Sequence, residues 1–216
     1  IQETEWGPIL AYDHDGIPLA LNWVAQHRDA ADLKLVQLEL AANVDQALGT
    51  AQQSGIPAQN FIVGDRKGNI GWTIAGRIPV RSGNYDPQLP ADWSNHETGW
   101  LGWLPSMHYP LISNPTNMRL WSANARLVEG IALERLGDGG YELGARSKQI
   151  RDSLLAKERF TTEDLFAVQL DHRALFLTRW QKLLYEIIDR APSESWKQKL
   201  ADGLLDWDGF AAPNSV

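Results

Sequence analysis

The sequence predicts an α+β fold, with strands and loops over residues 1–143 and helices over residues 144–216. Runs of β-branched and aromatic residues separated by turn signals fill the first part. A long stretch rich in Trp and Pro follows them, and its composition is typical of a loop. The last part shows amphipathic helical spacing with capping signals. With 216 residues, the chain can form one large domain or two small ones and can bury a real core.

The element around which the chain is organised is a predicted β-hairpin at residues 61–79. Its turn contains Gly68 and Asn69, which tolerate the positive φ that tight hairpin turns need. Glycine inside a strand is destabilising and often marks a bulge or a close approach of another group. Such glycines occur at Gly64, Gly71 and Gly76. The hairpin is therefore either simply glycine-rich or a wall against which something packs closely.

A second hairpin is expected at the start of the chain, with strands near residues 6–12 and 18–24. His14 lies between Asp13 and Asp15 in the turn, which raises the question of a metal site. Three adjacent side chains are poorly placed to converge on one ion, so a polar turn is favoured.

Helical patterns occur on both sides of the central hairpin. One helix is expected from about Asp32 and another from Asn43, whose side chain can cap the first turn. Thr161 and Asp164 form a capping signal for a later helix. The other predicted helices cover residues 144–155, residues 173–190 and a last segment from about Pro192.

The stretch from residue 82 to residue 115 is expected to be a long loop, and such loops are usually functional or tightly packed. Its aromatic residues fit either an apolar pocket or a surface that stacks sugars; they are Trp93, Trp100 and Trp103. Asp86 and Asp92 are weak candidates for a cation site.

Residues 117–126 read as a further strand that contains Asn124. Asn is a poor strand former, so this residue is either a satisfied polar group of the core or a hydrogen-bond donor aimed at a ligand. The residues alone favour the structural role.

Composition excludes several classes of function. The formal net charge of −7 and the pI of about 5.2 argue against a nucleic-acid partner, because phosphate binding needs a basic surface. Cysteine is absent, which excludes disulfides and thiolate chemistry. No apolar stretch has the length of a membrane span, so none is expected. P-loop, dinucleotide-binding, metalloprotease and nucleophile-elbow motifs are absent too.

The chain starts at Ile1 rather than Met, which suggests a piece of a longer protein. Its ten Trp residues are many for this length. Most are expected in the core of the chain itself, and the others fit an interface that normally meets missing polypeptide.

Several separate motifs resemble, in order and spacing, those of the penicillin acylase family. They are residues 59–79, residues 83–90, Asn114-Pro115 with residues 121–126, Gly144-Ala-Arg146 through Ile150-Arg151, and Leu170-Asp171 with Trp180. The resemblance implies an N-terminal nucleophile hydrolase with a four-layer αββα sandwich. It also implies hydrolysis of amides, among them penicillins, cephalosporins and acyl-homoserine lactones.

The resemblance assigns roles to three residues. Asn124 matches the oxyanion-hole Asn, and loss of such a donor weakens transition-state binding by about 3–4 kcal/mol. Arg146 matches an Arg that supports the catalytic groups by hydrogen bonding. Pro87 matches a position whose backbone carbonyl ligates a structural calcium ion in some members. No cofactor is expected for catalysis.

The chain departs from the family at the nucleophile, which is normally a Ser at the start of the β subunit with its own α-amine as base. Residue 1 is Ile, and its surroundings resemble sequence well downstream of that Ser. We therefore expect the middle portion of a β subunit that is inactive alone.

The resemblance also sets the expected partners and location. The partners are the remainder of the β subunit, the α subunit of the same precursor and a small-molecule amide substrate, in a periplasmic or secreted protein. The alternatives are a non-catalytic ligand- or sugar-binding module that uses the Trp-rich loop, and a degenerate family member retained for interaction.

Overall fold

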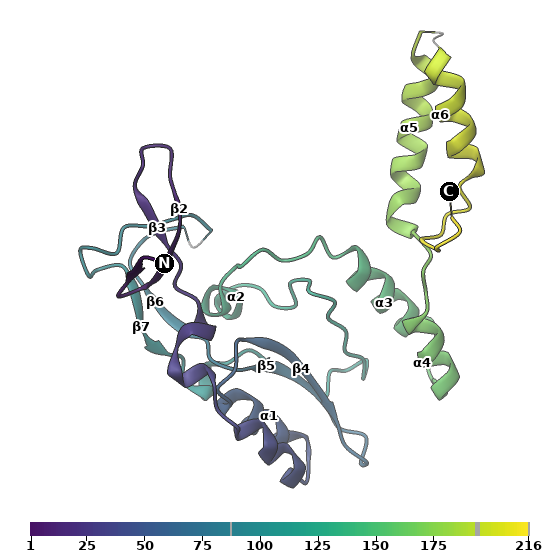
Figure 1. The fold of residues 1–216 in the computed structure, drawn as a ribbon. Helices are drawn as coiled ribbons and strands as arrows, with labels where there is room; N and C mark the ends of the chain where they lie inside the picture. Colours follow the sequence, from purple (N-terminus) through teal and green to yellow (C-terminus); the bar gives the residue numbers. More distant parts are fainter. Residues whose placement is uncertain (87, 193–194, 216) are drawn as a thin grey trace. The chain divides into compact units, whose positions relative to one another are not determined.

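The computed structural model describes residues 1–86, 88–192 and 195–215 (Figure 1). The chain forms two compact units, Ile1–Gly144 and Ala145–Val216. The first contains antiparallel sheets and short helices, and the second contains helices. The predicted combination of antiparallel strands with helices is thus confirmed, whereas the four-layer sandwich stays a prediction. None of the described helices is both long and apolar enough to cross a membrane.

The main sheet of the first unit has the order β4–β5–β8, with strands Gln59–Gly64, Ile70–Ala75 and Leu111–Ser113. β4 and β5 are the predicted hairpin, and they pair from Gln59 with Ala75 to Gly64 with Ile70. Asp65 closes the turn, because its Oδ1 accepts hydrogen bonds from the backbone N–H groups of Lys67 (2.9 Å) and Asn69 (3.0 Å). Gly68 has the expected positive φ of 89°.

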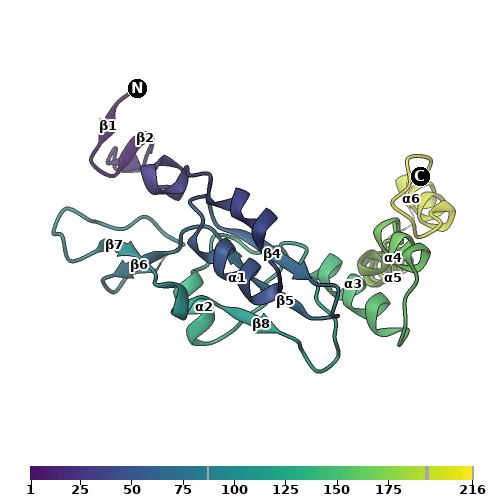
Figure 2. The same ribbon diagram turned by 90° about the horizontal axis from the view of Figure 1, so that it is seen from below.

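Helix α1 (Val44–Gln53) packs against β5 of this sheet (Figure 2). Asn43 caps it as predicted, since its Oδ1 accepts a hydrogen bond from Gln46 N at 2.9 Å. A Cβ added at Gly71 would lie 2.7 Å from Leu48 Cδ1 and 2.9 Å from Val44 Cγ1. The close approach suggested by the strand glycines is therefore real at Gly71, and the group that approaches is α1.

The core of the first unit is built on Trp72, Ile74, Ile78 and Tyr109, all of which are buried. The polar atoms inside it are paired. The Thr73 hydroxyl donates to Pro110 O at 2.8 Å, and the Tyr109 hydroxyl donates to Gly76 O at 2.7 Å. Tyr109 therefore fixes the chain just after β5, where Gly76 has a φ of 100°.

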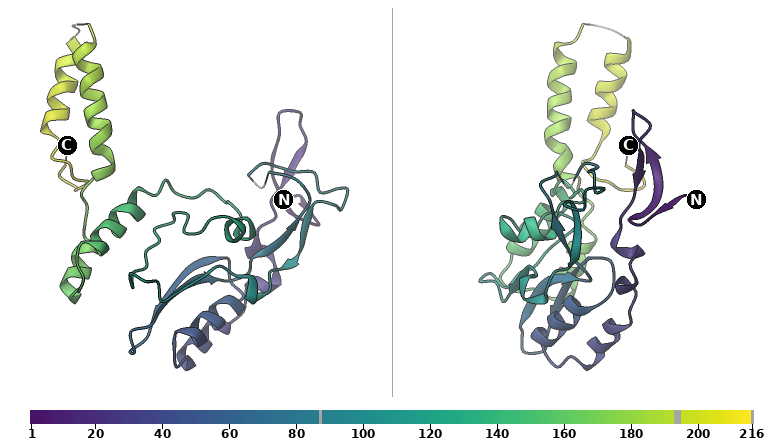
Figure 3. Two further views of the ribbon diagram at one scale, coloured as in Figure 1. Left: turned by 180° about the vertical axis from the view of Figure 1, so that it is seen from behind. Right: turned by 90° about the vertical axis from the view of Figure 1, so that its left-hand side faces the viewer.

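The predicted N-terminal hairpin is present as β2 (Gly7–Tyr12) and β3 (Pro18–Ala20), and β1 (Glu3–Thr4) pairs with β2 (Figure 3). Short 3-10 helices follow at Val24–Gln26, Arg28–Ala30 and Lys34–Leu40. The helix expected from Asp32 is therefore a 3-10 helix that begins at Lys34.

The long loop predicted over residues 82–115 is wrong in part, because two strands and a 3-10 helix (Ser106–His108) lie within it. β7 (Gly99–Trp103) pairs with β6 (Pro79–Ser82), and β8 completes the main sheet. Glycines inside β7 and prolines beside both strands weaken the β propensity of the sequence. The two segments become strands because they pair with distant parts of the chain.

The strand predicted over residues 117–126 is also wrong. Met118, Ala123 and Asn124 have positive φ values of 49°, 63° and 61°, which a strand does not allow. Only a single bridge, Ala125 to Glu142, occurs there. The helix α2 (Ile131–Leu136) that follows was not predicted.

The second unit contains α3 (Ala145–Leu155), α4 (Thr162–Gln169), α5 (Thr178–Arg190) and α6 (Ser195–Asp206). α4 begins with the predicted capping box of Thr161 and Asp164. α5 begins later than expected, after a 3-10 helix at Leu175–Leu177. α5 and α6 lie side by side as a helical hairpin (Figures 1 and 3).

Candidate functional site

Asn124 lies in a tight turn of the first unit rather than in a strand. Both Ala123 and Asn124 adopt the left-handed conformation, which Asn tolerates far better than Ala. The Asn124 carbonyl accepts a hydrogen bond from Glu142 N at 3.0 Å, and the next residue, Ala125, is buried. The backbone is thereby fixed while Asn124 itself is exposed to solvent.

The core holds this turn from both sides. Leu120 precedes the turn, Leu127 and Val128 follow it, and all three pack against the Trp72–Tyr109 cluster. The bend at residues 123–124 therefore joins two anchored segments. The bend thus fixes the backbone that carries the Asn124 side chain, and a side-chain amide N–H is a type of group that can stabilise a developing oxyanion.

Arg146 lies in the first turn of α3 and is exposed. The first turn of α3 contains no acidic residue. A cation at a helix N-terminus is unfavourable, because the N-terminal end of the helix dipole is positive. The helix dipole itself therefore does not favour an Arg at this position. Asn124 belongs to the first unit and Arg146 to the second.

Pro87, the third residue assigned by resemblance, lies outside the described residues. The nearby acids are engaged locally. Asp86 Oδ1 accepts a hydrogen bond from Gln88 N at 2.9 Å, and Asp92 Oδ1 accepts one from Ser94 N at 2.8 Å. Hydrogen bonding to Ser94 also lowers the pKa of Asp92. Asp86 and Asp92 thus each close their own turn.

Within the described part of the chain, Asp13, His14 and Asp15 form the only group of three or more potential metal ligands. Their donor atoms lie within 4.8 Å of one another, closer than we expected for adjacent residues. Asp13 Oδ1 nevertheless accepts hydrogen bonds from Asp15 N (2.9 Å) and Ile17 N (2.8 Å). These contacts are those of a polar turn, as predicted.

The Trp-rich segment folds into an aromatic cluster that includes His27. His27 stacks on Trp100 at 5.4 Å between ring centroids, and Trp103 meets the edge of His27 at 5.3 Å. Trp93 lies 6.2 Å from Trp100. The Trp103 indole also donates a hydrogen bond to Asp29 Oδ2 at 2.8 Å. The rings contact one another and are partly buried, which weakens the case for a sugar-stacking platform.

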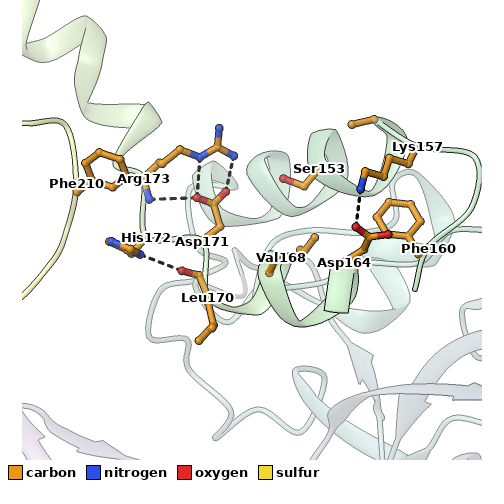
Figure 4. A pocket seen from close by; sticks show the side chains of 12 residues that line it. Ser153, Lys157, Phe160, Asp164, Val168, Leu170, Asp171, His172, Arg173 and Phe210 are labelled. Atoms are coloured by element: carbon orange, nitrogen blue, oxygen red, sulfur yellow. Dashed lines mark hydrogen bonds and ion pairs between the residues drawn. The ribbon is translucent and has the colours of Figure 1, made fainter. Parts of the chain in front are cut away.

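A cleft that sequence reasoning missed lies in the second unit and has a volume of about 410 Å³ (Figure 4). Its apolar lining includes Phe160, Val168 and Phe210. At one end Lys157 pairs with Asp164, and at the other Arg173 pairs with Asp171 (Figure 4). The run of Asp171, His172 and Arg173 was the available signal for the second pair.

The Asp171 carboxylate binds side chains from its own segment and from α3. Arg173 donates from Nε to Oδ1 (2.8 Å) and from Nη2 to Oδ2 (2.7 Å), and Gln149 Nε2 of α3 donates to Oδ2 at 2.8 Å. Hydrogen bonding from Arg173 holds the pKa of Asp171 well below its usual range, with Gln149 adding to the effect. Asp171 thus ties α3, which carries Arg146, to the segment that follows α4.

Comparison with known proteins decides the family. The penicillin amidase family model matches residues 1–216. The chain belongs to the penicillin amidase family. Its curated relatives include penicillin acylase 2 proenzyme from Pseudomonas sp. (strain SE83), which is 28% identical over 215 residues, covering 97% of this chain and 27% of that protein.

Acyl-homoserine lactone acylase QuiP from Pseudomonas syringae pv. syringae (strain B728a) is a further relative, with 29% identity over 234 residues, 100% of this chain and 28% of that protein. The chain thus spans about a quarter of the length of these curated relatives. Among solved structures, thermostable penicillin G acylase from Alcaligenes faecalis matches with a TM-score of 0.69 at 20% identity. That match covers 98% of this chain and 38% of the other, and it extends the likeness to the fold.

Proposed function

We propose that this penicillin amidase family chain is the middle portion of the β subunit of an exported amidohydrolase that cleaves linear amides by acyl transfer. The N-terminal nucleophile comes from polypeptide outside residues 1–216, as do the α subunit and the rest of the β subunit. Penicillins and acyl-homoserine lactones are candidate substrates, because the named relatives are a penicillin acylase and an acyl-homoserine lactone acylase. Cephalosporins are a further candidate from the motif resemblance alone.

Asn124 carries the proposal, because its left-handed turn is held between core-packed Leu120 and Leu127. In the proposed reaction, the nucleophile oxygen attacks the amide carbon, and its proton passes to the α-amine of the same residue. The former carbonyl oxygen, which now carries a negative charge, accepts a hydrogen bond from Asn124 Nδ2. Collapse of this intermediate breaks the C–N bond, and the leaving amine takes the proton. Water then hydrolyses the ester, which releases the acid and frees the nucleophile.

Arg146 is proposed to position groups of this site by hydrogen bonding. Support comes from its place in the first turn of α3, where the helix dipole disfavours a cation. Arg146→Lys keeps the charge and loses the planar fork of donors. A positioning role predicts loss of kcat in both Arg146→Lys and Arg146→Ala, whereas a role of charge alone predicts rescue by Lys.

The test of Asn124 uses two substitutions in the full-length mature protein. Asn124→Gly removes the amide and keeps a residue that accepts the left-handed backbone. Asn124→Ala removes the amide and adds backbone strain of about 1 kcal/mol. We expect both to lower kcat by about 10²–10³ with little change in KM, and only Asn124→Ala to lower stability as well.

Asn95→Gly serves as the matched control, because Asn95 is exposed in a different turn of the same unit. It is expected to leave kcat unchanged. Wild-type kcat in Asn124→Gly would overturn the oxyanion role. A calcium ligand at the Pro87 carbonyl and export of the protein remain predictions from the resemblance.

A further inference from the structure

Helix α5 carries an apolar stripe that the described helices of the second unit leave about half exposed. Its members are Trp180, Leu183 and Ile187, which are 46%, 44% and 55% exposed. Their spacing of three and four residues places them on one side of the helix. We call these three residues the α5 stripe.

The neighbouring helix α6 already occupies a different side of α5. Ile188 is buried and Leu184 is partly buried, and Gln181 Nε2 donates to Leu204 O of α6 at 2.9 Å. At 3.6 residues per turn, the α5 stripe together with Leu184 and Ile188 spans an apolar arc of about 140°. A surface helix has an apolar arc of at least about 100°, and the α5 stripe is the part of the α5 arc that α6 leaves exposed.

The polar side of α5 shows that the stripe is not a general feature of this helix. Lys182, Glu186 and Asp189 lie on the opposite side and are exposed. Arg179 places its guanidinium 4.7 Å from the Trp180 ring centroid, at one border of the stripe. A charged border around an apolar centre is the usual anatomy of a buried interface.

The amount of exposed surface is large for a chain of this size. The chain exposes 15,247 Å², whereas two separate compact globules of the size of its units would expose roughly 12,000 Å². The excess of about 3,000 Å² is several times the roughly 800 Å² that each partner contributes to a standard protein–protein interface. Exposed large apolar residues also occur in the first unit, at Leu40 and Met107 for example. A second copy of this chain bound to α5 would leave the exposed apolar residues of the first unit uncovered. A long polypeptide can cover several such patches.

We propose that the α5 stripe packs, in the full-length protein, against an apolar segment of the same precursor that lies outside residues 1–216. The inference rests on the proposed function, because it takes this chain to be part of a longer amidohydrolase. The named relatives support this occupant, since the chain accounts for 27% and 28% of their lengths.

The absence of cysteine from the chain allows a direct test. Leu183→Cys and Ile187→Cys are made singly in the full-length mature protein, after replacement of any cysteine elsewhere, and labelled with N-ethylmaleimide. Lys182→Cys on the polar side is the control. We expect the L183C and I187C thiols to react at least tenfold more slowly than the K182C thiol, and all three to react alike in urea. If the L183C and I187C thiols react as fast as the K182C thiol in the folded protein, the proposal is overturned. If one of the two stripe variants does not fold, the other alone provides the test.

The occupant is identified by coupling a photo-crosslinker to I187C and sequencing the attached peptide. A peptide from outside residues 1–216 is the expected result. A peptide from residues 1–144, or from residues 145–216 of a second copy, would overturn the choice of occupant. Acylase activity is measured on the unlabelled variants. Slow labelling in an inactive protein would refute the proposed function alone, whereas rapid labelling in an active protein would refute the docking alone.

Discussion

Arg173 binds Asp171 through two parallel hydrogen bonds, from Nε to Oδ1 at 2.8 Å and from Nη2 to Oδ2 at 2.7 Å. This fork geometry fixes both groups and is more specific than a point contact between charges. Gln149 adds a third side-chain donor at 2.8 Å from Oδ2. Asp171 therefore connects α3 with the segment that contains Asp171 and Arg173 in the second unit.

The stability of the second unit is expected to fall in acid because of Asp171. The folded state lowers the pKa of this carboxyl, so its contribution is complete above the unfolded pKa of about 3.9 and is lost as the pH falls toward the folded value. Asp171→Asn should lower stability at pH 7 by about 1–2 kcal/mol and flatten the decline below about pH 5. Urea unfolding from pH 7 to pH 3, followed by helical circular dichroism, measures both effects. Parallel pH profiles for the two proteins would contradict the prediction.

Replacement of Gly71 is expected to be destabilising because side chains of α1 lie directly over it. A methyl group there would lie 2.7 Å from Leu48 Cδ1, so Gly71→Ala should destabilise the first unit by about 1–3 kcal/mol. Gly64→Ala is the control in the same hairpin, because its methyl group would meet nothing closer than 3.6 Å. Chemical denaturation of both variants measures the difference. The prediction fails if the two midpoints coincide.

Ala123 is expected to be under backbone strain at a φ of 63°. Glycine accepts this conformation freely, although it also raises the entropy of the unfolded chain. Ala123→Gly should therefore increase stability, by up to about 1 kcal/mol. The Ala125→Gly control lies outside the left-handed turn, removes a buried methyl group and should decrease stability. A thermal melt that ranks the two variants in the opposite order would argue against strain at Ala123.

Residues 1–216 alone are predicted to hydrolyse no chromogenic amide, because the proposed nucleophile lies elsewhere in the precursor. The measurement is an amidase assay on the purified chain, with the full-length mature protein as the positive control. Activity of the isolated chain that disappears in Asn124→Ala would contradict both the missing nucleophile and the proposed division of the site.

Local signals in the sequence predicted the elements whose hydrogen bonds close within a few residues. Asn43 caps α1, Thr161 and Asp164 form a capping box, and the turn at Gly68 closes the hairpin, all as expected. Each depends on side chains and backbone groups that are neighbours along the chain.

The features that were missed depend on partners far away in the sequence. β7 becomes a strand because it pairs with β6, although its own glycines weaken strand propensity. Asn124 was expected in a strand because its neighbours are apolar. The core contacts of Leu120 and Leu127 bend the chain between them instead. The sequence thus named Asn124 as a candidate, whose role stays a prediction, while the turn that carries Asn124 was not predicted.

The boundary between Gly144 and Ala145 separates the two residues to which chemical roles are assigned, Asn124 and Arg146. Each proposed role can therefore be tested by substitutions within its own unit, without reference to the other unit.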